Sequence, residues 1–349
     1  CIRDSLWPSA SWRWAGWSRF LPLSLLNRCA ATCCAQEVEK NENCAENFGG
    51  LFGVAFIAVL AAVYFLGPSY GGALLGKPYF LFNASEKRIN TAMVDTAAIS
   101  GIYGESEEFQ RAREAFKADP TNAELLDAAI NAAGGKHSKV FSTEKEKAAE
   151  SAEPSVDFND GVLRATVPSI GRHDDGQAYA DTLAHGLTSH PEACAAVVDL
   201  RGNDGGDMGP MYAGLSPLLP DGTALSFVSR MTTSDVVIDG NSVTGGGTPT
   251  TTSGGKLNIP VAVLTDDETA SSAEATLLAF RGLDNTRTFG KPTAGYASAN
   301  VVLDYPDGRS LMLTTAKDKA RTGEEFAEDP IAPDAPESEL DGWLASRCS

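Results

Sequence analysis

An apolar run that turns abruptly into a helix is the feature that most constrains the fold of this chain. The segment IPVAVLTDDETASSAEATLLAF begins at Ile259 as a β-rich apolar run, turns through the acidic residues 266–268, and continues from Ser271 as an Ala- and Leu-rich helix. We therefore expect Ser271 at the mouth of a strand-to-helix turn. There its hydroxyl is exposed, and the first unpaired N–H groups of the helix point toward whatever it attacks.

The string DLRGNDGG at residues 199–206 predicts a second half of the same site. The apolar run Ala195–Leu200 suits a buried strand, and it ends in a Gly-rich loop whose backbone can approach a ligand closely. Gly205 and Gly206 could direct an N–H group at a developing oxyanion, with the N–H of Ser272 as the second donor. An ordinary glycine turn after a core strand is the alternative for this string taken alone.

Five ordered motifs give the chain a resemblance to a known family. DLRGNDGG, TASSAE, FGKPTAG, TTAKDKARTG and IAPD together resemble the C-terminal-processing, or tail-specific, proteases, a family of serine peptidases, over residues 132–334. The resemblance implies a twisted α/β core of the ClpP/crotonase kind and a serine nucleophile at Ser271. It also implies hydrolysis of peptide bonds in proteins or peptides, without a metal or organic cofactor.

The general base that the resemblance implies depends on the branch of the family. Many members pair the serine with a lysine, but here Tyr296 falls at the position of that lysine and Lys291 lies too early. The tricorn-like branch uses Ser, His and Glu, and its histidine lies in a string similar to GGKHS, which implies His137 as the base. A neutral imidazole with a pKa of about 6.5 can take the serine proton and return it to the leaving amine. Taken alone, His137 would be a surface histidine after a helix end.

The acidic partner of the histidine is expected just before the closing IAPD string. In the tricorn-like branch a glutamate precedes the terminal Pro-Asp by a few residues, which implies Glu328 here, with Glu325 and Asp329 as alternatives. A charge cluster near the end of a chain is usually a solvated face. Glu274, in the first turn of the helix after Ser271, is expected to complement the helix dipole.

Composition and motifs argue against metal, nucleotide and nucleic-acid binding. The sequence has no Cys-x-x-Cys pair or His-Glu-x-x-His string, and His173, His185 and His190 are expected to be solvated or capping residues. The Gly-rich residues 244–256 lack the Gly-Lys-Ser/Thr ending of a phosphate loop and are expected to form a surface loop near the active-site cleft. A net charge of −18 argues against a nucleic-acid partner.

Residues 51–67 are predicted to form a transmembrane or signal-anchor helix. The uncharged run LFGVAFIAVLAAVYFL, extended through Gly67, approaches the roughly 17–25 residues that span a bilayer. No small-residue cleavage site follows at once, which favours an uncleaved anchor over a removed signal peptide; a buried core helix is the alternative. The flanking charges would place the catalytic domain in the cytoplasm. The export that is usual in the family instead implies a periplasmic or extracellular domain.

The stretch before the apolar run differs from the rest of the chain. Residues 1 to about 37 show no helix or strand period, and we expect residues 1–50 to be poorly structured. This stretch is also expected to include sequence upstream of the native start, for example near Val38. Residues 1–50 hold five of the seven cysteines, which leaves Cys194 and Cys348 in the body of the chain. No disulfide framework is therefore expected.

The remainder is predicted to form a small helical module over residues 80–141 and a catalytic core over residues 155–337. A charged linker at 142–154 joins them. This linker is too short to hold the PDZ domain that many relatives insert between the two parts.

Two other functions are compatible with the implied fold. The same core occurs in retinoid-binding proteins that resemble these peptidases, so a catalytically silent ligand-binding module is one alternative. A crotonase-like enzyme acting on thioesters would use the glycine loop but not the serine. An intact Ser271 with a matched His137 favours a serine endopeptidase, whose partner is a protein or peptide substrate.

Overall fold

The computed structural model describes residues 42–147 and 151–348. The start expected near Val38 and most of the segment expected to be poorly structured lie outside them. Contacts divide the chain into two units, residues up to Val59 and residues from Leu60 to Ser349. The second unit contains the fold that positions the candidate site.

The predicted apolar helix is present and is longer than expected. Helix α2 spans Glu42–Leu75, and its stretch Val54–Leu75, with a mean hydropathy of 1.8, is long and apolar enough to cross a membrane. Its last turns pack within the second unit, because Thr96 Oγ1 donates to the Ser69 carbonyl over 3.2 Å. A Cβ added at Gly72 would also lie 3.3 Å from Leu303. The end of α2 therefore belongs to the folded domain.

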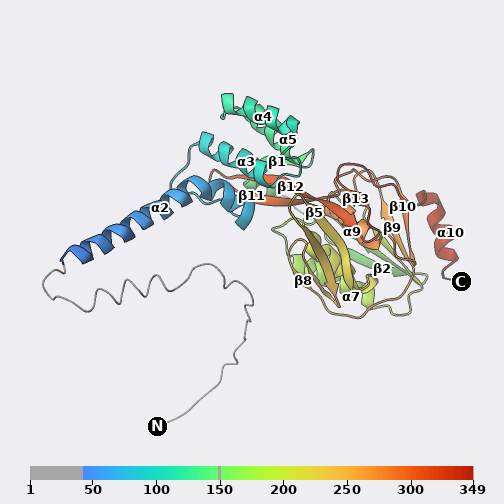
Figure 1. Ribbon diagram of the computed structural model, residues 1–349. Helices are drawn as coiled ribbons and strands as arrows, with labels where there is room; N and C mark the ends of the chain where they lie inside the picture. The colour runs from blue at the N-terminus through green and yellow to red at the C-terminus, as the bar shows by residue number, and fades with distance from the viewer. Residues whose placement is uncertain (1–41, 148–150, 349) are drawn as a thin grey trace, which may run out of the picture. The chain divides into compact units, whose positions relative to one another are not determined.

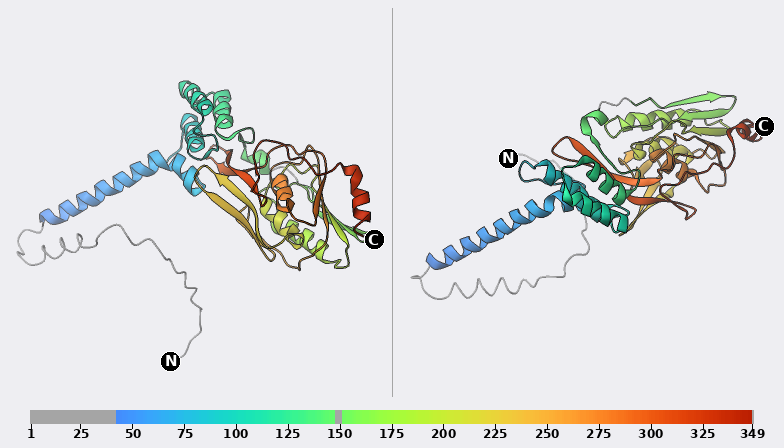
Figure 2. Two further views of the ribbon diagram at one scale, coloured as in Figure 1. Left: turned by 45° about the vertical axis from the view of Figure 1, so that its right-hand side comes forward. Right: turned by 90° about the horizontal axis from the view of Figure 1, so that it is seen from above.

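Three helices follow as a module that covers part of a sheet (Figures 1 and 2). They are α3 (Glu86–Ser100), α4 (Glu107–Ala118) and α5 (Ala123–Gly134). Their apolar faces enclose Met93, Phe109 and Ile130, and they share this core with Leu311 and Leu313 of a long strand of the sheet. Strand β1 (Lys139–Ser142) leaves α5 and pairs antiparallel with the same long strand, which ties the module to the core.

A five-stranded sheet sets the position of the predicted nucleophile. Its order is β10-β9-β4-β3-β2, with parallel pairing except between β2 and β3. Strands β4 (Ala195–Asp199) and β9 (Val261–Thr265) are apolar and lie side by side in the centre. Because both are parallel, their carboxyl ends meet at one edge of the sheet. The loop after β4 and the turn after β9 are joined there by a bond from Ala270 N to Asn203 O of 2.9 Å.

The second sheet is antiparallel and is built around the long strand β12 (Arg309–Ala320). Its order is β1-β12-β5-β6-β7-β8, and β11 (Ser298–Asp304) and β13 (Glu325–Phe326) also pair with β12. The register of β11 and β12 shifts between Ala299 and Asn300. Such irregularities redirect side chains and are frequent beside active sites.

The other elements complete the two layers. They are α6 (Thr143–Lys147), β2 (Ser155–Asn159), β3 (Val162–Thr166), α7 (Gly176–Thr188), α8 (Met208–Leu215), η1 (Ser216–Leu218), β5 (Gly222–Ser229), β6 (Thr233–Asp239), β7 (Ser242–Thr244), β8 (Thr250–Thr251), α9 (Ser272–Phe280), β10 (Thr286–Gly290), η2 (Glu337–Glu339) and α10 (Leu340–Ala345).

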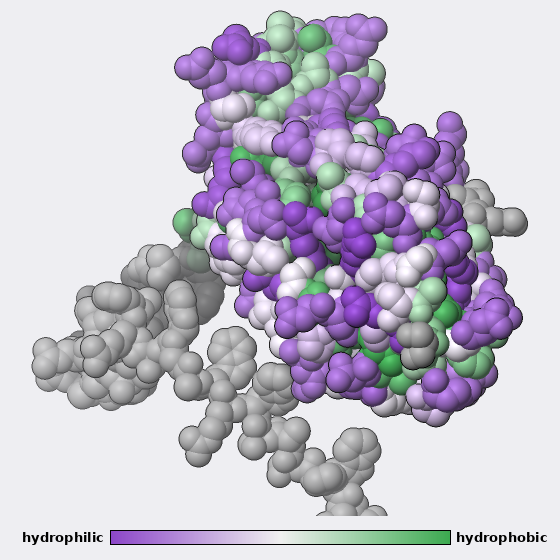
Figure 3. All heavy atoms as spheres, turned by 90° about the vertical axis from the view of Figure 1, so that its right-hand side faces the viewer, coloured by the Kyte–Doolittle hydropathy of each residue, from purple (hydrophilic) through white to green (hydrophobic). Residues whose placement is uncertain are grey.

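The main hydrophobic core lies between the sheets and contains α7, α8 and α9. Leu183, Met211, Tyr212 and Leu278 are fully buried in it. Hydrophilic residues cover most of the face in Figure 3, with smaller hydrophobic areas between them. The mixed α/β core preceded by a helical module confirms the predicted fold class.

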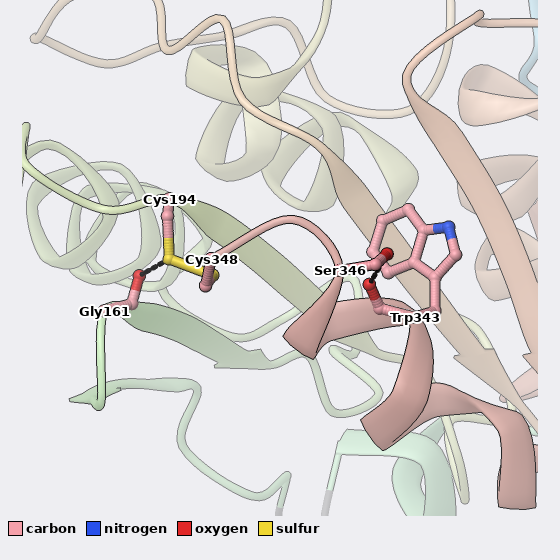
Figure 4. Close-up of a disulfide and its surroundings, with 5 residues drawn as sticks. All are labelled: Gly161, Cys194, Trp343, Ser346 and Cys348. Atoms are coloured by element: carbon pink, nitrogen blue, oxygen red, sulfur yellow. Dashed lines mark hydrogen bonds between the residues drawn. A yellow bond between two sulfur atoms is a disulfide. The ribbon is translucent and has the colours of Figure 1, made fainter.

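One disulfide joins the core to the end of the chain, contrary to the expectation from the cysteine count. Cys194 and Cys348 are bonded across a sequence separation of 154 residues (Figure 4). Cys194 immediately precedes β4. Helix α10, which precedes Cys348, is held on the sheet by Trp343, whose ring packs edge-on against Phe289 of β10 with 5.7 Å between ring centroids. The sequence could not indicate this pairing, because the docking of α10 on the five-stranded sheet brings the two cysteines together.

Candidate active site

Ser271 lies at the start of α9 in a strained backbone conformation. Its φ of 56° and ψ of −119° are unusual, and among the described residues the only other non-glycine residue with positive φ is Asp160. Such a conformation costs about 1–3 kcal/mol and persists only where neighbouring groups fix it. The strain therefore marks Ser271 as a residue that its surroundings hold in place at the predicted strand-to-helix turn.

Glu274 is the group that fixes this turn. Its side chain is fully buried, and its carboxylate accepts hydrogen bonds from Ser271 N (3.0 Å), Gly295 N (2.9 Å), Tyr296 N (2.6 Å) and the Thr293 hydroxyl. Burial raises the pKa of this carboxyl, and the four hydrogen bonds oppose the rise. Glu274 thus does more than complement the helix dipole, because it ties the turn at Ser271 to the segment that precedes β11.

The glycine loop lies directly against Ser271. A Cβ added at Gly205 would lie 2.7 Å from Ser271 Cβ, so glycine is required there for steric reasons. The Gly205 N–H is already bonded to Asn203 Oδ1 at 2.9 Å. Ser272 Oγ donates to the Gly206 carbonyl over 2.6 Å. In the described part of the chain, the N–H groups of Gly206 and Ser272 donate to no protein acceptor.

His137 lies in the short connection between α5 and β1, and its ring is half-buried. Its Nδ1 is 3.1 Å from Ser298 Oγ, and Asn300 Nδ2 lies 3.1 Å from each ring nitrogen. Tyr296 packs against the ring edge-on, with 5.0 Å between centroids. Burial, followed by the charges of Lys139 and Lys136, lowers the pKa of His137 to about 4. The imidazole is therefore neutral at physiological pH.

A cavity of about 200 Å³ joins the two halves of the site. Ser271, Ser272 and Gly206 line it on one side, and Ser298 and Asn300, which contact His137, line it on another. Gly247, from the predicted surface loop at residues 244–256, also borders it. Among the described residues, the hydrogen-bond partners of the His137 ring are Ser298 and Asn300, and Ser271 Oγ forms no hydrogen bond with it. In unliganded enzymes such bonds are often long and shorten when substrate binds.

Glu328 contacts Lys136, the residue before His137, but does not contact the His137 ring. The Glu328 carboxylate accepts from Lys136 N at 2.6 Å, and Lys136 Nζ donates to the Glu328 carbonyl at 2.9 Å. Glu325 lies in β13, 4.0 Å from Lys317 Nζ. Neither Glu325 nor Asp329 is hydrogen-bonded to the imidazole. Glu328 thus holds the backbone of the residue before His137.

The remaining candidates lie away from this cavity. Lys291 is exposed and pairs with Asp267 over 2.9 Å. His173 lies 3.7 Å from Glu146, and His190 lies 3.1 Å from Glu192 and stacks on Phe158. Within residues 42–147 and 151–348, no group of three His, Cys, Asp or Glu side chains is placed to hold a metal ion.

Sequence reasoning missed three residues that line the cavity or touch the imidazole: Ser298, Asn300 and Asp318. Ser298 and Asn300 lie on β11, after the FGKPTAG motif, whereas Asp318 lies on β12 inside the TTAKDKARTG motif, which gave it no role in the site. No local pattern distinguishes them, because the register of β11 on β12 decides which of their side chains reach the cavity.

Comparisons with known proteins identify the family of this chain. The family model "Peptidase family S41" matches residues 166–336. The nisin-resistance protein of Lactococcus lactis subsp. lactis is 33% identical over 290 residues, which cover 79% of this chain and 91% of that protein. A lipoprotein from Streptococcus agalactiae has a solved structure that is similar with a TM-score of 0.68 and 28% identity, covering 77% of this chain and 99% of that one.

The photosystem II D1 C-terminal processing protease is also among the similar solved structures. It has a TM-score of 0.39 and 17% identity, and the match covers 61% of this chain and 52% of that one. The chain belongs to peptidase family S41, which confirms the family suggested by its motifs. It is a peptidase of this family, and its substrate is a protein or a peptide.

The contact between Gly205 and Ser271 gives a prediction with a matched control. Gly205→Ala introduces a Cβ against Ser271 and should lower the rate of labelling by a fluorophosphonate by at least about 10²-fold, because misplacement of a reacting group by about 1 Å can cost that much. Gly222 has nearly the same φ (109° against 113°) but open space around it. Gly222→Ala should therefore lose the thermal stability that a positive φ costs, without the clash, and its labelling should be unchanged. Equal labelling of the two variants would contradict the contact.

Proposed function

We propose that this protein is a serine endopeptidase in which Ser271 attacks the peptide carbonyl and His137 acts as base and then as acid. The observation that carries the proposal is the strained Ser271, held against Gly205 and opening into a cavity whose wall also contacts His137. A catalytically silent ligand-binding module would not need to maintain this strain. A crotonase-like thioester enzyme would use the glycine loop without the serine.

The chemistry follows the general course of acyl transfer. The Ser271 hydroxyl proton moves to the imidazole as Oγ bonds to the carbonyl carbon, and the oxyanion that forms accepts from the N–H groups of Gly206 and Ser272. The imidazolium then gives its proton to the leaving amine, and the C–N bond breaks. Water next attacks the acyl ester, loses a proton to the same imidazole, and releases Ser271 with its proton restored.

Gly206 is a better oxyanion donor than Gly205 in this scheme. The Gly205 N–H is bonded to Asn203, so the role of Gly205 is to let the loop approach Ser271 without a side chain in between. Removing one such donor typically lowers the turnover rate by about 10²–10³-fold, so the backbone of the loop contributes to the rate about as much as a catalytic side chain does.

The imidazole is oriented by neutral partners. Ser298 and Asn300 contact its nitrogens, and Thr314 Oγ1 donates to Asn300 Oδ1 over 2.7 Å, which turns the Asn300 amide nitrogen toward the ring. Glu328 is a positioning residue in this scheme, because it acts on His137 only through the backbone of Lys136. The acid of the Ser-His-Glu set is thereby assigned a structural role rather than direct contact with the imidazole.

The similarity to a nisin-resistance protein suggests a substrate. We extend that relative's name to this chain as the hypothesis that it hydrolyses nisin. Hydrolysis would appear as new fragments in a mass spectrum of nisin incubated with the purified domain.

Loss of the nucleophile is the experiment that tests the proposal. A fluorophosphonate should label the wild-type domain, and Ser271→Ala should abolish both labelling and nisin cleavage, because Ser271 is the proposed nucleophile and is held in the strained conformation. Ser272→Ala is the neighbouring control and should retain labelling, since its hydroxyl donates to the Gly206 carbonyl and only its backbone N–H is assigned to the chemistry. Equal labelling of all three proteins would refute the assignment of Ser271.

The second prediction concerns the base. His137→Ala should lower kcat/KM by at least about 10³-fold. Lys291→Ala should stay within about tenfold of wild type, because its exposed pair with Asp267 contributes little. Since the folded-state pKa of His137 is about 4, the acid limb of kcat/KM should have its midpoint near that pH.

The same pKa sets a dependence of stability on pH. In the unfolded protein His137 is protonated below about pH 6.5, whereas in the folded protein it stays neutral down to about pH 4. Stability contributed by His137 should thus fall as the pH drops through this window, and His137→Ala should weaken the dependence. An acid limb near pH 6.5 would contradict the lowered pKa of His137. A larger effect of Lys291→Ala than of His137→Ala would return the Ser–Lys scheme.

We also propose that α2 anchors the protein in a membrane and that its catalytic domain is exported. Three observations support this: the apolar stretch Val54–Leu75, the Cys194–Cys348 disulfide, and the similarity to a protein described as a lipoprotein. Disulfides persist in oxidising compartments outside the cytosol. The disulfide therefore favours export over the cytoplasmic placement that the flanking charges indicate.

Fractionation tests this placement. The full chain should sediment with membranes, and Cys194 and Cys348 should resist alkylation in intact cells until a reductant is added. A chain that starts at Leu60 should be soluble and should still be labelled by a fluorophosphonate, because it keeps the turns of α2 that pack near Thr96. Free thiols in the full chain, or its recovery in the soluble fraction, would contradict the proposal.

A further inference from the structure

A buried carboxyl group lines the cavity beside Ser271 and takes no part in the proposed chemistry. Asp318 lies on β12, and its side chain is 1% exposed. It borders the same cavity of about 200 Å³ as Ser271, Ser272 and Gly206. Its Oδ1 is buried without a hydrogen-bond partner among the described residues. A buried polar atom without a partner is costly and calls for an explanation.

The surroundings of Asp318 contain another carboxyl but no cation bonded to it. Burial raises the pKa of Asp318 well above its ordinary value, and the charge of Glu274 raises it further. Arg321, three residues along the chain, directs its guanidinium to the Ala279 carbonyl at 2.9 Å. Lys317 and Lys319 alternate with Asp318 along the strand and are more exposed, as expected for the opposite face of β12. The cavity is therefore short of positive charge.

The rest of the cavity wall is largely apolar. Met208, Phe227, Ala275, Val302 and Met312 line it. At about 30 Å³ per water molecule, its volume corresponds to roughly seven waters, which is room for one long side chain. An apolar wall with one buried carboxyl group suits a side chain with a methylene stem and a charged end.

The position of the cavity relative to Ser271 selects one residue of a substrate. A carbonyl held between Ser271 Oγ and the N–H groups of Gly206 and Ser272 belongs to a residue whose Cα, which carries the side chain, is bonded directly to the carbonyl carbon. Because these same three residues border the cavity, that side chain can extend into it.

We propose that Asp318 selects substrates with lysine or arginine as the residue whose carbonyl Ser271 attacks. This inference rests on the proposed peptidase function and adds the substrate class. When the cationic end enters the cavity, the carboxyl group releases its proton to solvent and pairs with the cation as a carboxylate. Hydrogen bonds between charged groups contribute about 1.5–3 kcal/mol, which corresponds to roughly a 10- to 150-fold preference over an uncharged side chain of equal length.

Two matched covalent probes test the proposal on the domain from Leu60 onward or on the full chain. The probes are aminoalkyl diphenyl phosphonates with the side chain of lysine or of norleucine, which share the four-carbon stem and differ in the charge. In the wild type, the lysine probe should react with Ser271 at least about 10-fold faster than the norleucine probe. Asp318→Asn, which keeps the shape of the side chain, should bring the ratio near 1 and leave the norleucine rate within about threefold.

Control variants and outcomes are chosen to separate the possible failures. Asp239→Asn removes an exposed carboxylate from β6 and should leave the ratio of the two rates as in the wild type. A wild-type ratio near 1, or a preserved ratio in Asp318→Asn, would overturn the proposal. A glutamine probe that reacts faster than the lysine probe would also overturn it, because it would indicate recognition by a neutral carboxylic acid.

The proposed peptidase function fails in a different way. If a small fluorophosphonate does not label Ser271 in the wild type, the nucleophile assignment is wrong. If the fluorophosphonate labels Ser271 but neither phosphonate reacts, the cavity does not receive that side chain and only the specificity proposal is overturned. If Asp318→Asn reacts with neither probe, the ratio of the lysine-probe rate to the norleucine-probe rate in the wild type decides whether the specificity proposal holds.

Discussion

The buried carboxylate of Glu274 is the interaction on which the rest of the site depends. It accepts hydrogen bonds from the backbone N–H groups of Ser271, Gly295 and Tyr296 and from the Thr293 hydroxyl. It therefore joins the turn before α9 to the segment that follows β10. Four donors stabilise a charge that would otherwise be expensive to bury. They also explain how a serine with positive φ is maintained, because the turn cannot relax without breaking bonds inside the protein.

Each of the two sheets positions a different part of the site. Parallel pairing of β4 with β9 brings the glycine loop to Ser271. The antiparallel sheet supplies the other half. Strand β12 pairs with β1, which follows His137, and with β11, which carries Ser298 and Asn300. The position of the imidazole is therefore decided by strand register over a long segment, and Asp318 reaches the cavity from the same strand.

Some features could be predicted from the sequence because they depend on neighbouring residues. The strand-to-helix turn at Ser271, the glycine loop and the apolar helix each follow from an uninterrupted pattern of residue types. The family motifs extended this to the α/β core and the helical module, which the structure confirms. The role of Glu274 was incompletely predicted, because a local pattern identifies a first-turn acid but cannot reveal that residues 293–296 fold back onto it.

The sequence by itself determined the family, the order of the elements and the residue types at the turn and the loop, because these are properties of contiguous segments. The tertiary structure alone decided the Cys194–Cys348 disulfide, the partners of His137 and the burial of Asp318. It also directed Glu328 to the Lys136 backbone instead of to the imidazole. Each of these depends on contacts between residues far apart in the chain, and the docking of α10 and the register of β12 with β1 and β11 set which residues meet.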